Sequence, residues 1–146
     1  MESFESLSAR DLYALLALRV EVFVVEQDCP YQDIDGLDFD ARHVSAWRGE
    51  IPLAYARLLG PGVRFDEPSI GRVVTAGSAR RTGLGRELVR RAIEAADRAW
   101  PGRAVRISAQ RYLERFYAEF GFETVSEPYL EDGIPHLEMI RPNTGT

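Results

Sequence analysis

The stretch that decides the fold is "RRTGLG", residues 80–85, which lies between "SIGRVVTAGSA" (69–79) and "RELVRRAIEAADRAW" (86–100). Residues 70–76 are rich in β-branched side chains and predict a strand. Residues 83–99 predict an amphipathic helix, because leucine and alanine recur on one face while charged side chains lie away from it. The quoted stretch is therefore expected to form a strand-to-helix turn.

This turn is suited to holding an anion. The first amides of a helix have no backbone acceptors, and the helix dipole adds partial positive charge at that end. Gly83 and Gly85 let a ligand approach the backbone closely, and Arg80, Arg81 and Arg86 add full charges. The sequence therefore predicts a pyrophosphate site at the start of the helix.

Two common nucleotide motifs do not explain the turn. The dinucleotide fingerprint GxGxxG would need a glycine at position 88, which is Leu88, and no βαβ unit surrounds it. A P-loop requires a lysine, and all 18 basic residues of this chain are arginines. The turn therefore matches neither of these two motifs.

Working outward from the turn, hydrophobic periodicity and turn residues predict one mixed α/β sheet domain over residues 1–146. Ser8, followed three residues later by Asp11, predicts a helix start, and Pro30 requires that helix to end before Cys29. The element order is β-α-β-β-β-α-β-α-β-β. Strands are expected at 3–7, 43–49, 52–59, 70–76, 104–108, 122–125 and 136–140, with helices at 8–28, 83–99 and 111–119 and an acidic loop at 28–42.

The bulk composition is that of a soluble globular domain. The chain has 146 residues, 45% hydrophobic and 28% charged, with one cysteine, Cys29. No apolar run reaches the roughly 20 residues of a membrane span, and residues 1–10 lack the basic cluster of a secretory signal. We therefore expect a cytoplasmic protein without membrane partners and without an intrachain disulfide.

Charge is distributed unevenly along the chain. Residues 70–120 hold 11 arginines and 5 acidic residues, whereas residues 1–50 hold 11 acidic residues and 4 arginines. A basic middle between acidic flanks predicts an anion at the centre and a cation near the flanks, unless these charges are simply solvated. The net charge of −5 disfavours nucleic acid as a partner.

Several segments together resemble one protein family. Residues 80–85 fit (Q/R)-x-x-G-x-(G/A), and residues 116–122, "FYAEFGF", fit F-Y-x-x-x-G-F. The segments "VFVVEQDCPYQDIDG" (22–36), "IGRVV" (70–74) and "EDGIPH" (131–136) add to this pattern. The chain thus resembles the GCN5-related N-acetyltransferase (GNAT) superfamily, in its ElaA-type branch. That resemblance implies a mixed sheet of about six to seven strands with about three to four helices.

The resemblance also implies a cofactor and most of a site. Acetyl-CoA would lie between two splayed strands, and a backbone amide on the Val74 strand would bind the oxyanion. Tyr117 takes the position of the general acid that protonates the leaving thiolate. The cofactor-binding residues implied are Val73, Val74, Thr75, Arg80, Arg81, Thr82, Gly83, Leu84, Gly85, Arg86 and Gln110.

The general base is left open, because the strand at 70–75 contains no carboxylate. Candidates for the base and the acceptor pocket are Glu26, Asp33, Asp35, His43 and His136, or the amine arrives deprotonated from solvent. The acidic loop is read either as a pocket wall that attracts a cationic amine or as solvated surface. It is not a calcium loop, since position 12 is valine where an EF-hand needs glutamate, and we expect no metal.

Two functions from different classes follow from these observations. The first is an acetyl-CoA-dependent N-acetyltransferase that acts directly on a primary amine of a small molecule, peptide or protein. The second is a non-catalytic acyl-CoA-binding or sensing module, which the missing strand carboxylate favours and Tyr117 opposes. Dimers are common in the superfamily, so a homodimer is also considered.

Overall fold

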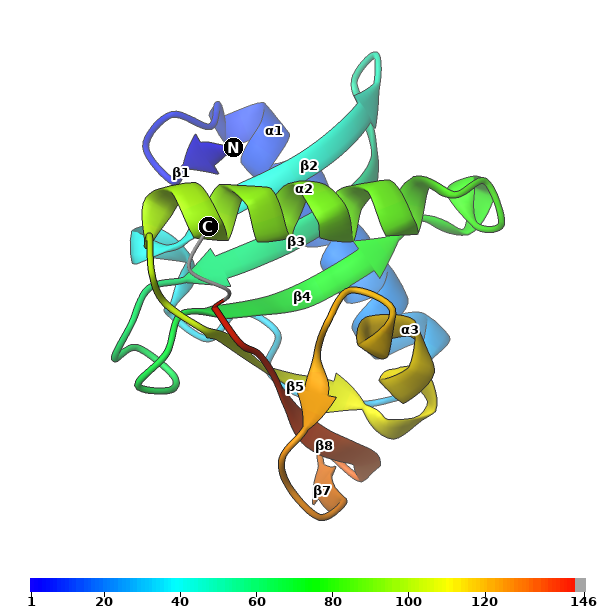
Figure 1. The fold of residues 1–146 in the computed structure, drawn as a ribbon. Helices are drawn as coiled ribbons and strands as arrows, with labels where there is room; N and C mark the ends of the chain where they lie inside the picture. Colours follow the sequence, from blue (N-terminus) through cyan, green and yellow to red (C-terminus); the bar gives the residue numbers. More distant parts are fainter. Residues whose placement is uncertain (144–146) are drawn as a thin grey trace.

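The computed structural model describes residues 1–143, in which eight strands form one mixed sheet. The strand order is β1-β2-β3-β4-β5-β8-β6, and β7 pairs with β8 beside β6 (Figure 1). The neighbours β4 and β5 are parallel, and every other pair is antiparallel. The strands are Glu2–Ser3 (β1), Arg42–Arg48 (β2), Ile51–Leu59 (β3), Ser69–Thr75 (β4), Val105–Gln110 (β5), Glu123–Thr124 (β6), Tyr129–Glu131 (β7) and Ile134–Arg141 (β8).

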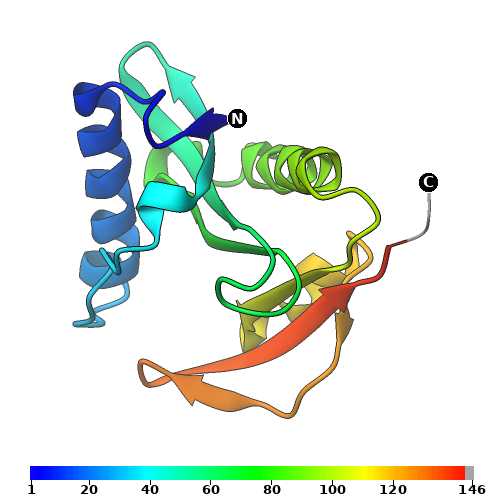
Figure 2. The ribbon, with the colours of Figure 1, turned by 90° about the vertical axis from the view of Figure 1, so that its left-hand side faces the viewer.

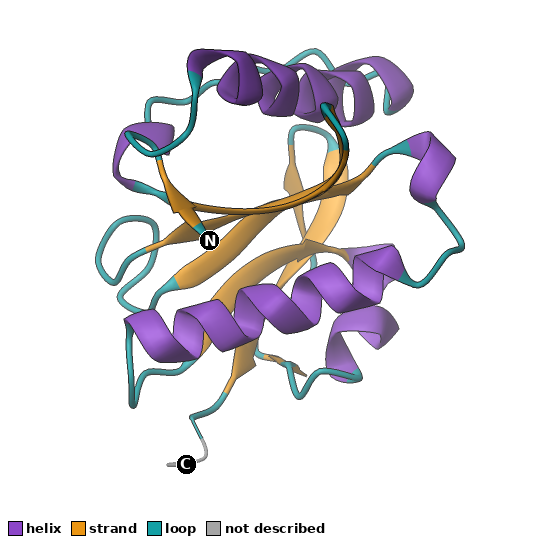
Figure 3. Cartoon of the chain, turned by 90° about the horizontal axis from the view of Figure 1, so that it is seen from above, coloured by secondary structure: helices purple, strands orange, loops and turns teal. Residues whose placement is uncertain are grey.

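Helices cover both faces of the sheet. The α-helices are Ala9–Val20 (α1), Leu84–Ala99 (α2) and Glu114–Ala118 (α3), and α1 continues as a π-helical segment, Glu21–Glu26. Figures 2 and 3 show α1 on one face of the sheet and α2 on the other. Short 3₁₀ turns span Asp38–Asp40, Gly77–Ala79 and Arg111–Leu113.

Side chains that point alternately to the two faces of β3 belong to two separate hydrophobic clusters. Ala54, Ala56 and Leu58 belong to the cluster that packs under α2 and α3, whereas Tyr55 packs with Leu15 of α1 on the opposite face. Successive side chains of a strand point to opposite faces, so one buried strand serves both clusters.

Helices α1 and α2 begin where their sequences predict, whereas the helix expected from residue 111 starts as a 3₁₀ turn and becomes α3 at Glu114. The Ser8 hydroxyl accepts a hydrogen bond from the Asp11 amide at 3.0 Å, which caps α1. Helix α2 follows Gly83, whose φ of 84° is the left-handed conformation that glycine adopts at little cost. The expected mixed α/β fold and the principal elements are therefore confirmed.

The C-terminal hairpin is the main feature that the sequence reading missed. Strand β7 pairs with β8 through a two-residue turn, in which Asp132 has a φ of 51° and Gly133 a φ of 77°. Asp-Gly between β-forming residues is a recognised hairpin signal. The expected strands 3–7 and 122–125 are reduced to two residues each. Residues 4–7 form a turn and a bend, and β6 comprises Glu123 and Thr124, followed by one more backbone hydrogen bond from the Val125 amide to the Glu138 carbonyl.

The neighbouring strands β4 and β5 diverge from a single point of contact. Among the described residues they are in register at Ser69 and Arg106 alone. Beyond that point Ala56 of β3 lies opposite two β4 residues, Arg72 and Val73, and Arg72 has a φ of 51°. Such a β-bulge bends its strand and is common beside functional sites. The bend opens a V-shaped gap between β4 and β5 (Figure 1).

Within residues 1–143, no helix has both the length and the apolar character needed to cross a bilayer.

Candidate active site

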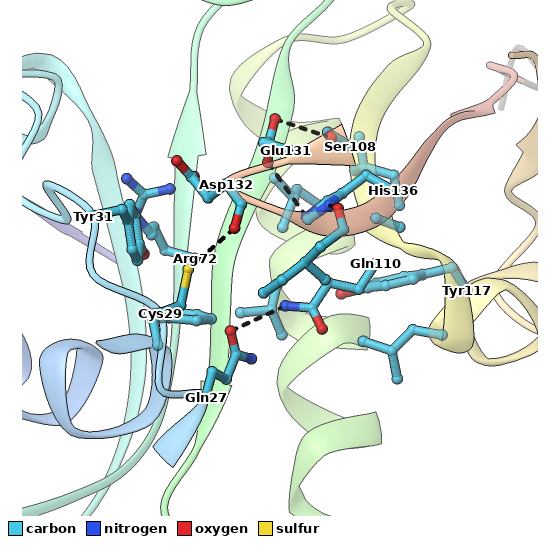
Figure 4. A pocket seen from close by; sticks show the side chains of 18 of the residues that line it. Gln27, Cys29, Tyr31, Arg72, Ser108, Gln110, Tyr117, Glu131, Asp132 and His136 are labelled. Carbon is cyan, nitrogen blue, oxygen red and sulfur yellow. Dashed lines mark hydrogen bonds and ion pairs between the residues drawn. The ribbon is translucent and has the colours of Figure 1, made fainter. Parts of the chain in front are cut away.

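A cavity of about 110 Å³ lies in the gap between β4 and β5 (Figure 4). Its walls come from five parts of the chain: β4, β5 with the turn and helix α3 that follow it, the β7–β8 hairpin, the segment that follows α1, and the loop between β3 and β4. Both apolar and polar side chains line it, as is usual for a small-molecule site. The lining side chains used below are Gln27, Cys29, Tyr31, Arg64, Arg72, Ser108, Gln110, Tyr117, Glu131 and His136.

The edge of β4 that faces the cavity has no strand partner beyond Ser69 in the described part of the chain. Backbone donors and acceptors along residues 70–75 are therefore available to an extended ligand, which could pair with them as an added strand would. Val73 lines the cavity, Val74 is buried against α1, and Thr75 ends the strand.

The anion-binding turn predicted from sequence lies at the start of α2. Arg81 and Gly83 both have positive φ, of 64° and 84°. Within residues 1–143 the amides of Gly85 and Arg86 donate to no protein acceptor. A Cβ on Gly85 would lie 3.3 Å from Thr75 Oγ1, so that position has little room for a side chain. These features fit a bound phosphate.

The Thr82 hydroxyl stabilises this turn from within. It donates to the Ala79 carbonyl at 2.5 Å and accepts from the Leu84 amide at 3.4 Å. Two arginines flanking the turn are paired with acids from neighbouring elements. Arg80 Nη2 lies 2.6 Å from Glu26 Oε1, and Arg86 pairs with Glu119. Because these pairs are exposed, each contributes little to stability and is easily exchanged for another anion.

Tyr117 of α3 lines the cavity across from Tyr31 and Arg72 (Figure 4). Its ring packs edge-on against Phe116 and Phe122. Its hydroxyl has no hydrogen-bond partner among the described residues. Burial, with a smaller contribution from Tyr112, raises the pKa of Tyr117 above its ordinary value. The phenol therefore stays protonated and can serve as a donor.

Two contacts cross the cavity between distant segments (Figure 4). Gln110 Nε2 of β5 donates to Gln27 Oε1 at 3.4 Å, and Cys29 Sγ donates to the Asp132 carbonyl at 3.4 Å. The segment after α1 thus touches both β5 and the β7–β8 turn, so it closes one side of the cavity.

The β7–β8 hairpin supplies a polar cluster around Glu131. Its Oε1 accepts from Arg64 Nη2 at 2.6 Å and from the Ser108 hydroxyl at 3.4 Å. Its Oε2 lies 3.3 Å from His136 Nε2. His136, which the sequence analysis selected as a pocket residue, lies in the cavity wall and is 7% exposed.

Asp33 and Asp35 do not line the cavity, because arginines hold the acidic loop. Asp33 pairs with Arg19 and Arg72, and Asp35 pairs with Arg57 and Arg72. Burial acts to raise the pKa of Asp35, but hydrogen bonds from Arg57 and from the Leu37 amide lower it to about 2. Three arginines balance three aspartates in this network, which comprises Arg19, Arg57, Arg72, Asp33, Asp35 and Asp38 and is called the buried charge cluster below.

His43 and Glu26 also lie outside the cavity wall. His43 is 1% exposed, with its Nδ1 2.6 Å from the Tyr55 hydroxyl and its Nε2 3.1 Å from the Asp38 carbonyl. Burial lowers the pKa of His43, so the ring is neutral and both nitrogens are used within the core. Glu26 instead faces the turn before α2, through Arg80.

The sequence analysis did not select Glu131, Gln27, Tyr31 or Arg72. One signal was available for Glu131, because Asp132-Gly133 predicts a hairpin that brings Glu131 toward His136. No local pattern indicated Arg72, since its importance depends on the bulge in β4. No group of three or more histidine, cysteine or acidic side chains within residues 1–143 is arranged to hold a metal ion.

Comparison with known proteins agrees with this geometry. The profile of the acetyltransferase (GNAT) domain matches residues 10–141. ElaA of Escherichia coli K12 is 46% identical over 137 residues, which are 92% of this chain and 90% of that protein. The crystal structure of an acyl-CoA N-acyltransferase from Pseudomonas aeruginosa has a TM-score of 0.91 and 50% identity, covering 96% of this chain and 95% of the other.

The structure of Escherichia coli ElaA itself has a TM-score of 0.88 and 45% identity, covering 94% of this chain and 93% of the other. The resemblance that residues 80–85 and 116–122 predicted is therefore confirmed over nearly the whole length. The chain belongs to the GNAT acetyltransferase family and, within it, is of the ElaA type.

Proposed function

We propose that the protein transfers the acetyl group of acetyl-CoA directly to a primary amine. One arrangement carries the proposal: the unpaired edge of β4 runs from the cavity that Tyr117 lines to the turn before α2, where the amides of Gly85 and Arg86 donate to no acceptor in residues 1–143. Coenzyme A has a pyrophosphate, an amide-containing arm and a thioester in that order, so its chemistry matches this arrangement.

Each part of the site takes a role in binding. The amides of Gly85 and Arg86, with the charge of Arg80 and Arg81, hold the pyrophosphate. Residues 73–75 pair with the pantetheine amides through their backbone, and Gln110 contacts the cofactor from β5. Acetyl-CoA supplies an activated acyl group whose thioester is more reactive toward amines than an ordinary ester.

Two groups act on the reacting atoms. A backbone amide beside Val74 stabilises the negative charge that develops on the carbonyl oxygen. Tyr117 donates its proton to the departing thiolate, a task suited to a phenol held protonated by burial. Cys29 is not a nucleophile in this scheme, because transfer is direct and its Sγ–H is engaged with the Asp132 carbonyl.

The competing function is a non-catalytic acyl-CoA-binding module. It is favoured by the sequence of β4, which contains no carboxylate that could act as a general base. Calorimetric titration with acetyl-CoA and coenzyme A, using NAD and ATP as controls, tests binding. Thiol release in the presence of an amine panel then tests transfer. Binding of the coenzyme A species without transfer to any amine supports the module instead.

A matched pair of glycine variants tests the phosphate-binding turn. Gly83 and Gly102 have φ of 84° and 78°, and a Cβ at either position meets nothing within 4 Å. Glutamate therefore causes similar backbone strain at both positions, but only at Gly83 would it put negative charge beside the pyrophosphate. We expect Gly83→Glu to lower acetyl-CoA affinity at least about tenfold and Gly102→Glu to leave it unchanged. Equal acetyl-CoA affinities in the two variants would mean that the pyrophosphate does not bind at this turn.

A further inference from the structure

His136 and Glu131 meet in the cavity wall, with Nε2 of the ring 3.3 Å from Oε2 of the carboxylate, so a hydrogen must lie between these two atoms or a third group must donate to both. His136 Nδ1 lies 2.7 Å from the Ile134 carbonyl, so this nitrogen carries a proton and donates it. In a neutral ring Nε2 then presents a lone pair, and it faces Glu131 Oε2 at 3.3 Å. A lone pair and a carboxylate repel at that distance. The pair is satisfied only by an added proton or by a cation that donates to both atoms.

The hairpin register produces this arrangement. Tyr129 pairs with His136 and Glu131 pairs with Ile134, so all four side chains lie on one face of the hairpin. Glu131 and His136 are diagonal neighbours on that face, within reach of each other. The same face turns toward β5, where the Ser108 hydroxyl contacts Tyr129.

The other neighbouring side chains donate no hydrogen bond to His136 Nε2 or Glu131 Oε2 within residues 1–143. Arg64 and Ser108 both bond to Oε1 of Glu131, the oxygen that points away from His136 Nε2. Tyr129 stacks on the His136 ring, and Gln110 is its register partner on β5. Neither supplies a charge to Nε2. Figure 4 shows Glu131, His136 and Ser108 grouped on one side of the cavity, which Tyr117 also lines.

We propose that the part of the cavity beside Glu131 and His136 is the acceptor site. A compact primary amine binds there as its ammonium and donates to Glu131 Oε2 and His136 Nε2 together. The inference rests on the N-acetyltransferase function proposed above and names its substrate class. Glu131 holds the charge, and His136 accepts one proton. Quaternary ammonium ions are excluded, because they carry no N–H group and can donate to neither atom.

The ammonium gives one proton to His136 Nε2, which later passes it to solvent. The neutral nitrogen attacks the thioester carbonyl, so a C–N bond forms and the C–S bond breaks. The thiolate takes the Tyr117 proton, and the surplus proton on the new amide nitrogen restores the phenol. The net products are the N-acetyl amine, free thiol and one released proton.

The test uses the full chain with ¹⁵N-labelled histidine. The sequence holds two histidines, so His43 serves as an internal reference in the core. The protein is titrated with n-propylammonium chloride and, as a control, with tetramethylammonium chloride, which has charge but no N–H. The variants are Glu131→Gln and the matched control Glu127→Gln, since Glu127 is exposed and outside the cavity lining.

We expect propylammonium to shift the ring nitrogens of His136 saturably, with His43 unchanged and tetramethylammonium without effect. Glu131→Gln weakens this binding at least about tenfold, and Glu127→Gln does not. Equal responses in the two variants, or no response of His136 in the wild type, would overturn the acceptor site. A kinetic counterpart follows for any amine that the wild type acetylates: Glu131→Gln lowers kcat/KM by about 100-fold or more without changing acetyl-CoA affinity.

The outcomes separate this inference from the function beneath it. If His136 responds as expected but no amine is acetylated, the ammonium site stands and the transferase function fails. If amines are acetylated while His136 ignores propylammonium, the transferase function stands and the acceptor site lies elsewhere.

Discussion

Neutralising Asp38 should destabilise the fold more than any surface charge change nearby. The Asp38 side chain is 7% exposed and accepts from Arg19 Nη1 at 2.7 Å and Arg57 Nη1 at 3.2 Å. Burial acts to raise the pKa of Asp38, but the hydrogen bond and charge of Arg19, helped by Arg57, lower it. The carboxylate is therefore ionised at neutral pH.

Asp38→Asn keeps the shape of the side chain and removes its charge. The buried charge cluster then holds three arginines against two aspartates, so one buried cation is uncompensated. Removing one partner of a buried ion pair costs about 3–5 kcal/mol. Asparagine still accepts a hydrogen bond, so we expect about 3 kcal/mol. For a chain of this length that lowers Tm by roughly 6–12 °C.

Urea unfolding followed by circular dichroism measures this change, and Asp40→Asn is the matched control. Asp40 is exposed and belongs to the same 3₁₀ turn, so its neutral variant should stay within about 0.5 kcal/mol of the wild type. If Asp38→Asn is within about 1 kcal/mol of Asp40→Asn, the cluster is not balanced as argued, and its arginines must have other anions.

Two further predictions follow from the same structure. Tyr117→Phe leaves no buried group unpaired, so stability and acetyl-CoA affinity should hold while kcat falls by about 10²–10⁴, measured by thiol release; the control is Tyr112→Phe, at a residue that is 76% exposed, and a fall of less than tenfold would assign the proton to another donor. The pKa of Asp35 is lowered to about 2, so its stabilising contribution is complete above the unfolded pKa of about 4 and is lost as pH falls from there toward 2. Because the Asp35 side chain is 25% exposed, we expect only about 1 kcal/mol after screening, seen as a steeper loss of stability on acidification in the wild type than in Asp35→Asn; parallel profiles would contradict that assignment.

The elements around residues 80–85 could be predicted because their determinants are local. A β-branched run, two glycines and an amphipathic repeat lie within 30 residues of one another, and each acts through its own backbone or one helix face. The Ser8 cap and the position of Tyr117 follow for the same reason, since both depend on residues a few positions apart.

The acidic loop shows what local pattern cannot supply. In the sequence, residues 33–40 are a run of aspartates with no basic residue among them. Their partners Arg19, Arg57 and Arg72 come from α1, β3 and β4, and only packing of those elements around the loop brings the charges together. When two charged residues lie far apart in the chain, the sequence does not indicate whether they will pair or stay solvated.

The side of the cavity formed by Glu131 and His136 also depends on tertiary structure. Sequence alone determined the family and the turn before α2, and it singled out Tyr117, which lines the cavity, because these lie in contiguous motifs. The bulge at Arg72, the burial of His43 and the convergence of Glu131 on His136 were decided by strand register and by the divergence of β4 from β5. Electrostatic interactions depend on distance and burial, and for residues far apart in the chain both are set only when the sheet is assembled.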